Sequence, residues 1–167
     1  MTTLTPAAIR HACTVLSAPG LIRLVTEIDD NGPIPPRSLT RTLPDLPVPQ
    51  LRHSVEQARA LRLVHNRPGA GLTLTPSGSG LADVYDAMAR WARHHGLPAP
   101  VCDFTSRVQH ALSLYAVPTA LTSQEGREGA PVIETGEKHA SPGGDLLTQW
   151  LHENPQLVQG AEPVLAA

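Results

Sequence analysis

The hydrophobic pattern over residues 38–75 predicts two short helices followed by a tight β-hairpin. Leu39 and Leu43 lie four residues apart in the first helix. The second helix, expected over residues 48–61, carries an apolar stripe at three-to-four-residue spacing. The stripe consists of Leu51, Val55, Ala58 and Leu61. Each helix therefore has one face to bury.

Prolines separate these two helices, and a glycine-containing turn follows them. Residues 44–47 interrupt the helical pattern, and Pro49 occupies a first-turn position where proline costs no backbone hydrogen bond. Apolar and polar residues then alternate over 63–65 and 72–74, on either side of a turn whose glycines can adopt a positive φ. The order helix, turn, helix and hairpin is typical of a winged helix-turn-helix.

Helical patterns flank this region on both sides. Thr5 and Thr75 each precede a proline, which is typical of a helix start, and an apolar stripe follows each of them. Another stripe over 21–28 ends at a polar segment that contains glycine, and Asp103 stands near the start of a helix that ends before Pro118. The chain is therefore predicted to be mainly α, with a small β-hairpin as its wing.

The pattern divides the chain into four segments. We expect a winged helix-turn-helix domain at 1–97, used for DNA binding and dimerisation, and an additional helix at 98–121. Residues 122–144 are rich in Gly, Ser, Glu, Lys and Pro, which favours a flexible linker. Residues 145–167 should form a short helix and a tail, and the apolar face of that helix must dock somewhere.

Charge is distributed unevenly along the chain. The formal net charge is −2, yet residues 1–97 contain ten arginines and seven acidic residues, whereas residues 98–167 contain three basic and eight acidic residues. A positive field need cover only the surface that contacts phosphates. The overall charge therefore does not exclude a nucleic-acid binder. The abundance of Arg, Ala and Pro suggests a bacterial chain from a GC-rich genome.

Several classes of protein find no support in the sequence. It has no apolar run of the roughly twenty residues that cross a bilayer and no signal-peptide pattern after Met1, so we expect a cytoplasmic protein without a membrane partner. His11 and Cys13, two apart on a helix, point in different directions and do not suggest a metal site. No phosphate loop, nucleophile elbow or paired carboxylates appear. We therefore expect no metal, no cofactor and no enzymatic activity.

The two cysteines, Cys13 and Cys102, cannot form a disulfide framework and should be free thiols. Cys13 lies on an apolar helical stripe, which favours a buried small hydrophobic residue over a redox sensor. Cys102 stands beside a helix start and an acid, whose effects on a thiolate oppose each other. The sequence makes no prediction for Cys102.

The helical periodicity selects candidate DNA contacts. If Leu51, Val55 and Ala58 face the core, the opposite side of that helix should enter the major groove, while the preceding helix and the wing at 66–72 should contact phosphates. Gln can pair with an adenine edge and Arg with a guanine edge. The predicted DNA-binding residues are Arg37, Ser38, Arg41, Gln50, Arg52, His53, Gln57 and Arg67. The alternative is that Arg52 pairs with Glu56 and that Arg37 and Arg41 form a solvated face.

The helix after Thr75 carries a wide apolar stripe that includes aromatic residues, in a chain with few of them. Part of this stripe is therefore expected to meet a second subunit. The predicted interface residues are Leu81, Tyr85, Met88 and Trp91.

Residues 16–95 resemble the HxlR group of bacterial regulators, which is close to the MarR group of winged-helix proteins. The resemblance rests on LSAPGLIRLVTEI, on the uninterrupted helix-turn-helix from RSLTRTL to ARALRLV, and on LTLTPSGSGLADVYDAMARWARHH. It implies a homodimeric, repressor-type transcription regulator that places one recognition helix per subunit in a major groove of double-stranded DNA. Pro19-Gly20 stands where the group usually has Lys-Trp, the wing is short, and residues after 97 have no counterpart in the group.

Two other functions remain open at this point. A winged-helix module without DNA binding could hold a protein partner through its long helix and the DLLTQWL segment, consistent with the modest charge of the wing. An enzyme accessory or antitoxin-like partner would fit the linker and terminal helix. The effector, whether a small molecule or a protein, is not identified by the sequence.

Overall fold

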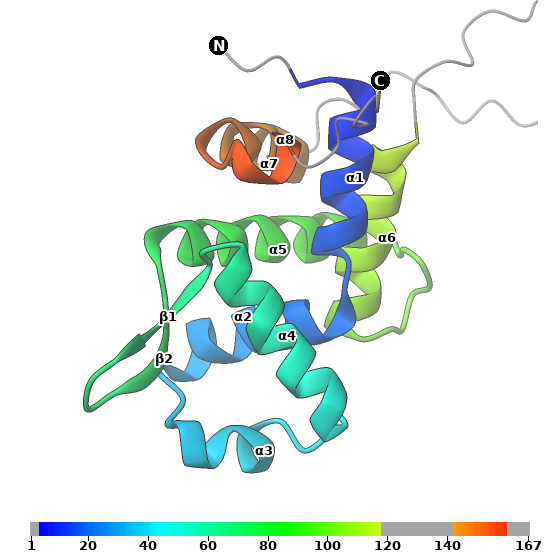
Figure 1. Ribbon diagram of the computed structural model, residues 1–167. Coiled ribbons are helices and arrows are strands. Elements are labelled where there is room, and N and C mark those ends of the chain that lie inside the picture. The colour runs from blue at the N-terminus through cyan, green and yellow to red at the C-terminus, as the bar shows by residue number, and fades with distance from the viewer. Residues whose placement is uncertain (1–3, 118–141, 160–167) are drawn as a thin grey trace, which may run out of the picture.

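Helices dominate the part of the chain that the computed structural model describes, residues 4–117 and 142–159 (Figure 1). The elements of the first half are α1 (Pro6–Leu16), α2 (Pro19–Asn31), the 3-10 turn η1 (Pro36–Ser38), α3 (Leu39–Thr42) and α4 (Val48–Ala60). They are followed by β1 (Val64–Arg67), β2 (Gly71–Leu74), α5 (Pro76–His94), α6 (Phe104–Ala116), α7 (Pro142–Glu153) and α8 (Gln156–Gln159). The predicted mainly helical chain with one small antiparallel hairpin is confirmed.

Three of the predicted helix starts are formed by side-chain caps. The Thr5 hydroxyl accepts from the backbone N–H of Ala8, the Thr75 hydroxyl from that of Gly78, and the Asp103 carboxylate from that of Ser106, at 3.2, 3.1 and 2.8 Å. Each bond satisfies a donor that has no partner within its own helix. The sequence positions of α1, α5 and α6 therefore follow from local chemistry.

Backbone hydrogen bonds connect the hairpin to the segment that precedes η1. Strands β1 and β2 pair antiparallel, and Ile34 forms an isolated bridge to Leu72 with hydrogen bonds of 3.0 and 2.8 Å. Gly71 has a φ of +102°, and a Cβ atom there would collide with the backbone of Ile34 and Pro35. Only glycine meets both requirements, so it fixes the base of the wing against the body of the protein.

The C-terminal end of α1 is held by three other helices. Its last turn offers backbone carbonyls, and side chains from α4, α5 and α6 donate hydrogen bonds to three successive ones. The pairs are Gln57 Nε2 with Val15 O at 3.4 Å, Tyr85 Oη with Leu16 O at 2.7 Å, and Gln109 Nε2 with Ser17 O at 2.8 Å. These bonds join α4, α5 and α6 through the end of α1.

Helix α7 packs on α5, so the apolar face predicted near the C-terminus docks on its own chain (Figure 1). Leu147, Trp150 and Leu151 are buried, and Trp150 Nε1 donates to Ser77 O at 2.8 Å. The helix begins at Pro142, so the predicted linker is too long by three residues at its end. The rest of that linker, and the tail beyond residue 159, lie outside the described residues.

Most of the apolar stripe on α5 is buried inside a single chain. Leu81, Tyr85 and Met88, expected at a dimer interface, are already buried within one chain, and Trp91 is half-buried. Tyr85 bonds the end of α1, and α2, α6 and α7 all pack on α5, so a second subunit could reach the first three side chains only if helices of the same chain moved away. Burial within one chain is enough to account for their hydrophobicity, and the dimer interface stays a prediction.

No helix in the described ranges combines the length and the apolar character that crossing a membrane requires.

Candidate nucleic-acid interface

Helix α4 and the turn before it are positioned by α2 through two contacts. The first is an ion pair between Arg23 on α2 and Asp45 in the turn between α3 and α4, with Nε–Oδ2 at 2.9 Å and Nη2–Oδ1 at 3.2 Å. This two-point geometry aligns the guanidinium with the carboxylate more tightly than a single bond would. Arg23 also lies 4.0 Å from Glu27. The turn is therefore tied to the helix behind it.

The second contact is a close approach of α2 and α4. Gly20 faces Ser54, and a Cβ atom at residue 20 would meet the Ser54 hydroxyl and come within 3.2 Å of its Cβ. Ser54 is buried and donates to Gln50 O at 2.8 Å. Two small residues thus let the backbones of these helices come together, which sets the angle at which α4 is presented.

The exposed face of α4 differs from the predicted one. Ser54 is buried together with Leu51, Val55 and Ala58, and this rotates the buried side of the helix. Gln57 is half-buried and turned toward α1, where its Nε2 contacts Val15 O and its Oε1 has no hydrogen-bond partner in the described chain. Gln57 therefore faces α1 more than solvent in this structure, and its entry into a DNA groove stays a prediction.

Gln50 lies partly inside as well, because it is half-buried beside the Gly20–Ser54 contact. The exposed residues of α4 with charged or imidazole side chains are Arg52, His53, Glu56 and Arg59. Arg52 and His53 are exposed as expected, and their contact with DNA stays a prediction; Glu56 and Arg59 are also exposed but were not among the predicted contacts. Ser54 could have indicated this orientation of α4 from the sequence, because a small polar residue can be buried when its side chain bonds its own helix backbone.

The remaining predicted contacts lie in η1, α3 and the hairpin. Arg37, Arg41 and Arg67 are exposed, and Ser38 is half-buried. In Figure 1, α3, α4 and the hairpin lie at the end of the molecule away from α7 and α8. Five of the eight predicted residues are thus exposed to a partner, on elements that share one end of the fold: Arg37, Arg41, Arg52, His53 and Arg67.

The arginines of this region are not engaged with acidic side chains. Within residues 4–117 and 142–159, the ion pairs are those of Arg23 with Asp45 and Glu27. Arg52 does not pair with Glu56, so the intrahelical alternative is not formed here. Unpaired guanidinium groups retain all their donors for phosphates or for guanine edges.

The cysteines do not add a second chemistry to this surface. Cys13 is buried on α1, as predicted, and burial raises the pKa of its thiol to about 11. The thiolate, which is the reactive form, is thereby disfavoured. In the described ranges no three His, Cys, Asp or Glu side chains gather as a metal-binding group.

Comparisons of the chain with models of protein families, with curated proteins and with solved structures find no match.

Proposed function

We propose that this protein is a sequence-specific DNA-binding transcription regulator of the winged helix-turn-helix type, acting as a homodimer of the repressor kind. The observation that carries the proposal is the arrangement of α3, the Asp45 turn, α4 and the hairpin, with unpaired arginines on each of these helices and on the wing. Helix α4 would enter a major groove, and the β1–β2 turn would lie along the phosphate backbone.

The surface chemistry suits base reading by α4. Arg52 and Glu56 are four residues apart and therefore share one face of the helix. Arginine bonds the O6 and N7 atoms of guanine, and glutamate accepts from the N4 amino group of cytosine. The exposed residues of α4 would therefore prefer a site that contains G·C pairs. Arg37, Arg41 and Arg67 would set affinity through phosphates.

The proposed homodimer would use the part of α5 that its own chain leaves accessible. Of the four predicted interface residues, Trp91 is half-buried and still accessible in part, whereas the other three are covered by their own chain. A contact through the C-terminal end of α5 around Trp91 remains open to a second copy. The oligomeric state in solution, measured by light scattering with wild type and Trp91→Ser, tests it.

The alternative is a winged-helix module that binds a protein partner and not DNA. Two observations favour it. Glu56 places an acidic side chain on the exposed face of α4, and the hairpin carries little charge, with Arg67 as its single charged residue. A carboxylate on this face would repel phosphates unless it meets a donor group on a base.

A salt series separates the two functions. Purified protein of known oligomeric state is titrated onto the duplex upstream of its own coding sequence and onto a scrambled duplex. A DNA-binding regulator should prefer the first duplex. The logarithm of its affinity should fall linearly with the logarithm of the salt concentration, and the slope gives the number of phosphate contacts. Equal and negligible binding to both would favour the protein-partner module.

Arg41→Ala and Arg10→Ala form a matched pair of variants for this titration. Both residues are exposed arginines, but Arg41 lies on α3 and Arg10 on α1. Loss of a phosphate contact should weaken binding to every duplex and reduce the salt slope by about 1. We expect this for Arg41→Ala and no change for Arg10→Ala; an equal effect of both would reveal attraction by overall charge alone.

A further inference from the structure

A pocket of about 370 Å³ lies where α2, α5 and α6 meet, outside the proposed DNA-contacting surface. Helix α2 contributes Ile22, Thr26 and Asp30 to its lining, α5 contributes Asp86, and α6 contributes Phe104. These helices are distant in the chain, so the pocket exists only in the folded protein.

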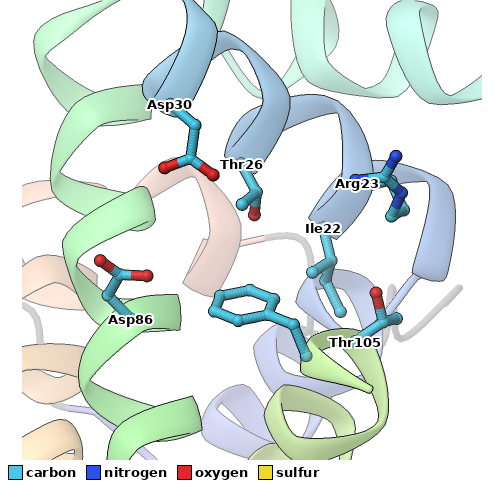
Figure 2. A pocket seen from close by; sticks show the side chains of 7 residues that line it. Ile22, Arg23, Thr26, Asp30, Asp86 and Thr105 are labelled. Carbon is cyan, nitrogen blue, oxygen red and sulfur yellow. The ribbon is translucent and has the colours of Figure 1, made fainter. Parts of the chain in front are cut away.

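Two carboxylates project toward this pocket from different helices. Figure 2 shows the side chains of Asp30 on α2 and Asp86 on α5 directed into the same space. Neither has a basic partner among residues 4–117 and 142–159. Arg23, which also lines the pocket, is bound to Asp45 at 2.9 Å and lies 4.0 Å from Glu27. The positive charge of Arg23 is therefore balanced by Asp45 and Glu27, and the carboxylates of Asp30 and Asp86 leave the pocket with a net negative charge.

The neighbouring acids strengthen that field. Burial raises the pKa of Asp29, and the nearby Asp30, Asp83 and Asp86 raise it further. Acids on α2 and α5 thus act on one another across the gap between the helices. A cation placed there would relieve this repulsion.

The rest of the lining is suited to the uncharged part of a ligand. Ile22 is fully buried and Phe104 is half-buried, so the two offer an aliphatic and an aromatic wall. Thr26 also lines the pocket, and its Oγ1 is shielded from water without a hydrogen-bond partner in the described residues. A helical threonine commonly bonds the carbonyl four residues earlier, which Thr26 does not do. A polar group is thus left unsatisfied at the wall of the pocket.

We propose that this pocket binds an organic ammonium ion with a compact apolar or aromatic body. The ammonium group would lie between Asp30 and Asp86, and the body would pack on Ile22 and Phe104, where an aromatic ring adds to the attraction for a cation. An anion would be repelled by the carboxylates. A tightly held divalent metal fits less well, since the described residues offer no group of three ligands.

The pocket shares Arg23 with the turn of the helix-turn-helix. The same side chain that lines the pocket holds Asp45. If the chain is the DNA-binding regulator proposed above, on which this step alone rests, an occupied pocket would change the position of Arg23 and hence of the α3–α4 turn. The ammonium ligand would then act as the effector.

Calorimetric titration of the DNA-free protein tests the ligand class without involving DNA. The probes are 2-phenylethylamine, 2-phenylethanol and phenylacetate at pH 7, which share a phenyl group and differ in charge. We expect the amine to bind about tenfold more tightly than the alcohol, and the carboxylate not to bind, because the pocket selects on charge. Equal binding of amine and alcohol, or no binding of the amine at millimolar concentration, would overturn the proposal.

Asp86→Asn and its matched control Asp83→Asn locate the site. Both residues are exposed acids on α5, but Asp83 does not line the pocket. Asp86→Asn should weaken amine binding about tenfold, and Asp83→Asn less than about twofold. Equal weakening by both would show a diffuse acidic field and no site. Circular dichroism verifies folding, and Asp30→Asn supplies the same test should Asp86→Asn not fold. Because no DNA is present, these results stand whether or not the protein binds DNA.

Discussion

The phenol oxygen of Tyr85 on α5 donates a hydrogen bond to the backbone carbonyl of Leu16 at the end of α1, at a distance of 2.7 Å. Both residues are fully buried, and burial raises the pKa of the Tyr85 phenol above its ordinary value, so the group stays a neutral donor. The neighbouring carbonyls of Val15 and Ser17 accept bonds from α4 and α6. The end of α1 therefore links α4 to α5 and α6.

Removing that phenol oxygen should destabilise the whole fold. Tyr85→Phe keeps the ring but leaves the Leu16 carbonyl buried without its partner, which costs about 1–3 kcal/mol of unfolding free energy. Urea denaturation followed by circular dichroism measures the change. A loss below about 0.5 kcal/mol would mean that water or another group satisfies the carbonyl, as for typical surface substitutions.

Gly20 should not tolerate a methyl group, because Ser54 on α4 occupies the space. Gly20→Ala is expected to cost about 1–3 kcal/mol by overpacking. Ser54→Ala removes the hydroxyl that is in the way, so the double variant should lose less stability than the two single variants together. Simple additivity in denaturant unfolding would contradict the close approach of α2 and α4.

Trp150 should hold α7 on α5. Its indole is buried and donates a hydrogen bond to Ser77 O. The ring also lies close to Gly80, where the Cβ atom of any other residue would come within 3.0 Å of it. Trp150→Ala should cost about 3–5 kcal/mol, the usual range for truncating a buried tryptophan. Gln149→Ala, at an exposed position of the same helix, is the control. Hydrogen exchange in α7 that is unchanged by Trp150→Ala would show that the helix docks by other means.

The Arg23–Asp45 pair should contribute little to stability and lose that contribution in acid. The hydrogen bond from Arg23 lowers the pKa of Asp45, so the contribution is present above the unfolded carboxyl pKa and disappears as pH falls through the lower folded value. Asp45 is exposed, which limits the effect to less than about 1 kcal/mol. Asp45→Asn and wild type should therefore unfold alike near pH 2. A difference in stability that grows toward low pH would contradict this.

Local sequence signals predicted much of this structure. Thr5, Thr75 and Asp103 begin helices because a short side chain can bond a nearby backbone N–H, and this chemistry is readable from neighbouring residues. The positions of α4 and the hairpin followed from spacing in the same way. Arg52 and His53 were consequently placed on the exposed face.

Long-range packing could not be read from the same signals. Gln57 was expected to face DNA because periodicity alone does not reveal that Ser54 is buried against Gly20 and rotates the helix. Likewise Leu81, Tyr85 and Met88 resembled an intersubunit stripe, since nothing local indicates which helices of the same chain pack on α5. A hydrophobic face indicates that a helix is buried, but it does not indicate whether the same chain or a second subunit covers that face.

Selection of binding sites from a random duplex library tests sequence-specific binding by α4 most directly. Wild-type protein should enrich one motif containing G·C pairs. Arg52→Ala should relax the motif at defined positions, at a cost of about 1–3 kcal/mol for the cognate site, whereas Arg67→Ala on the wing should lower affinity and leave the motif unchanged. Failure of the wild-type protein to enrich any sequence, or an identical motif from Arg52→Ala, would contradict recognition of DNA by this helix.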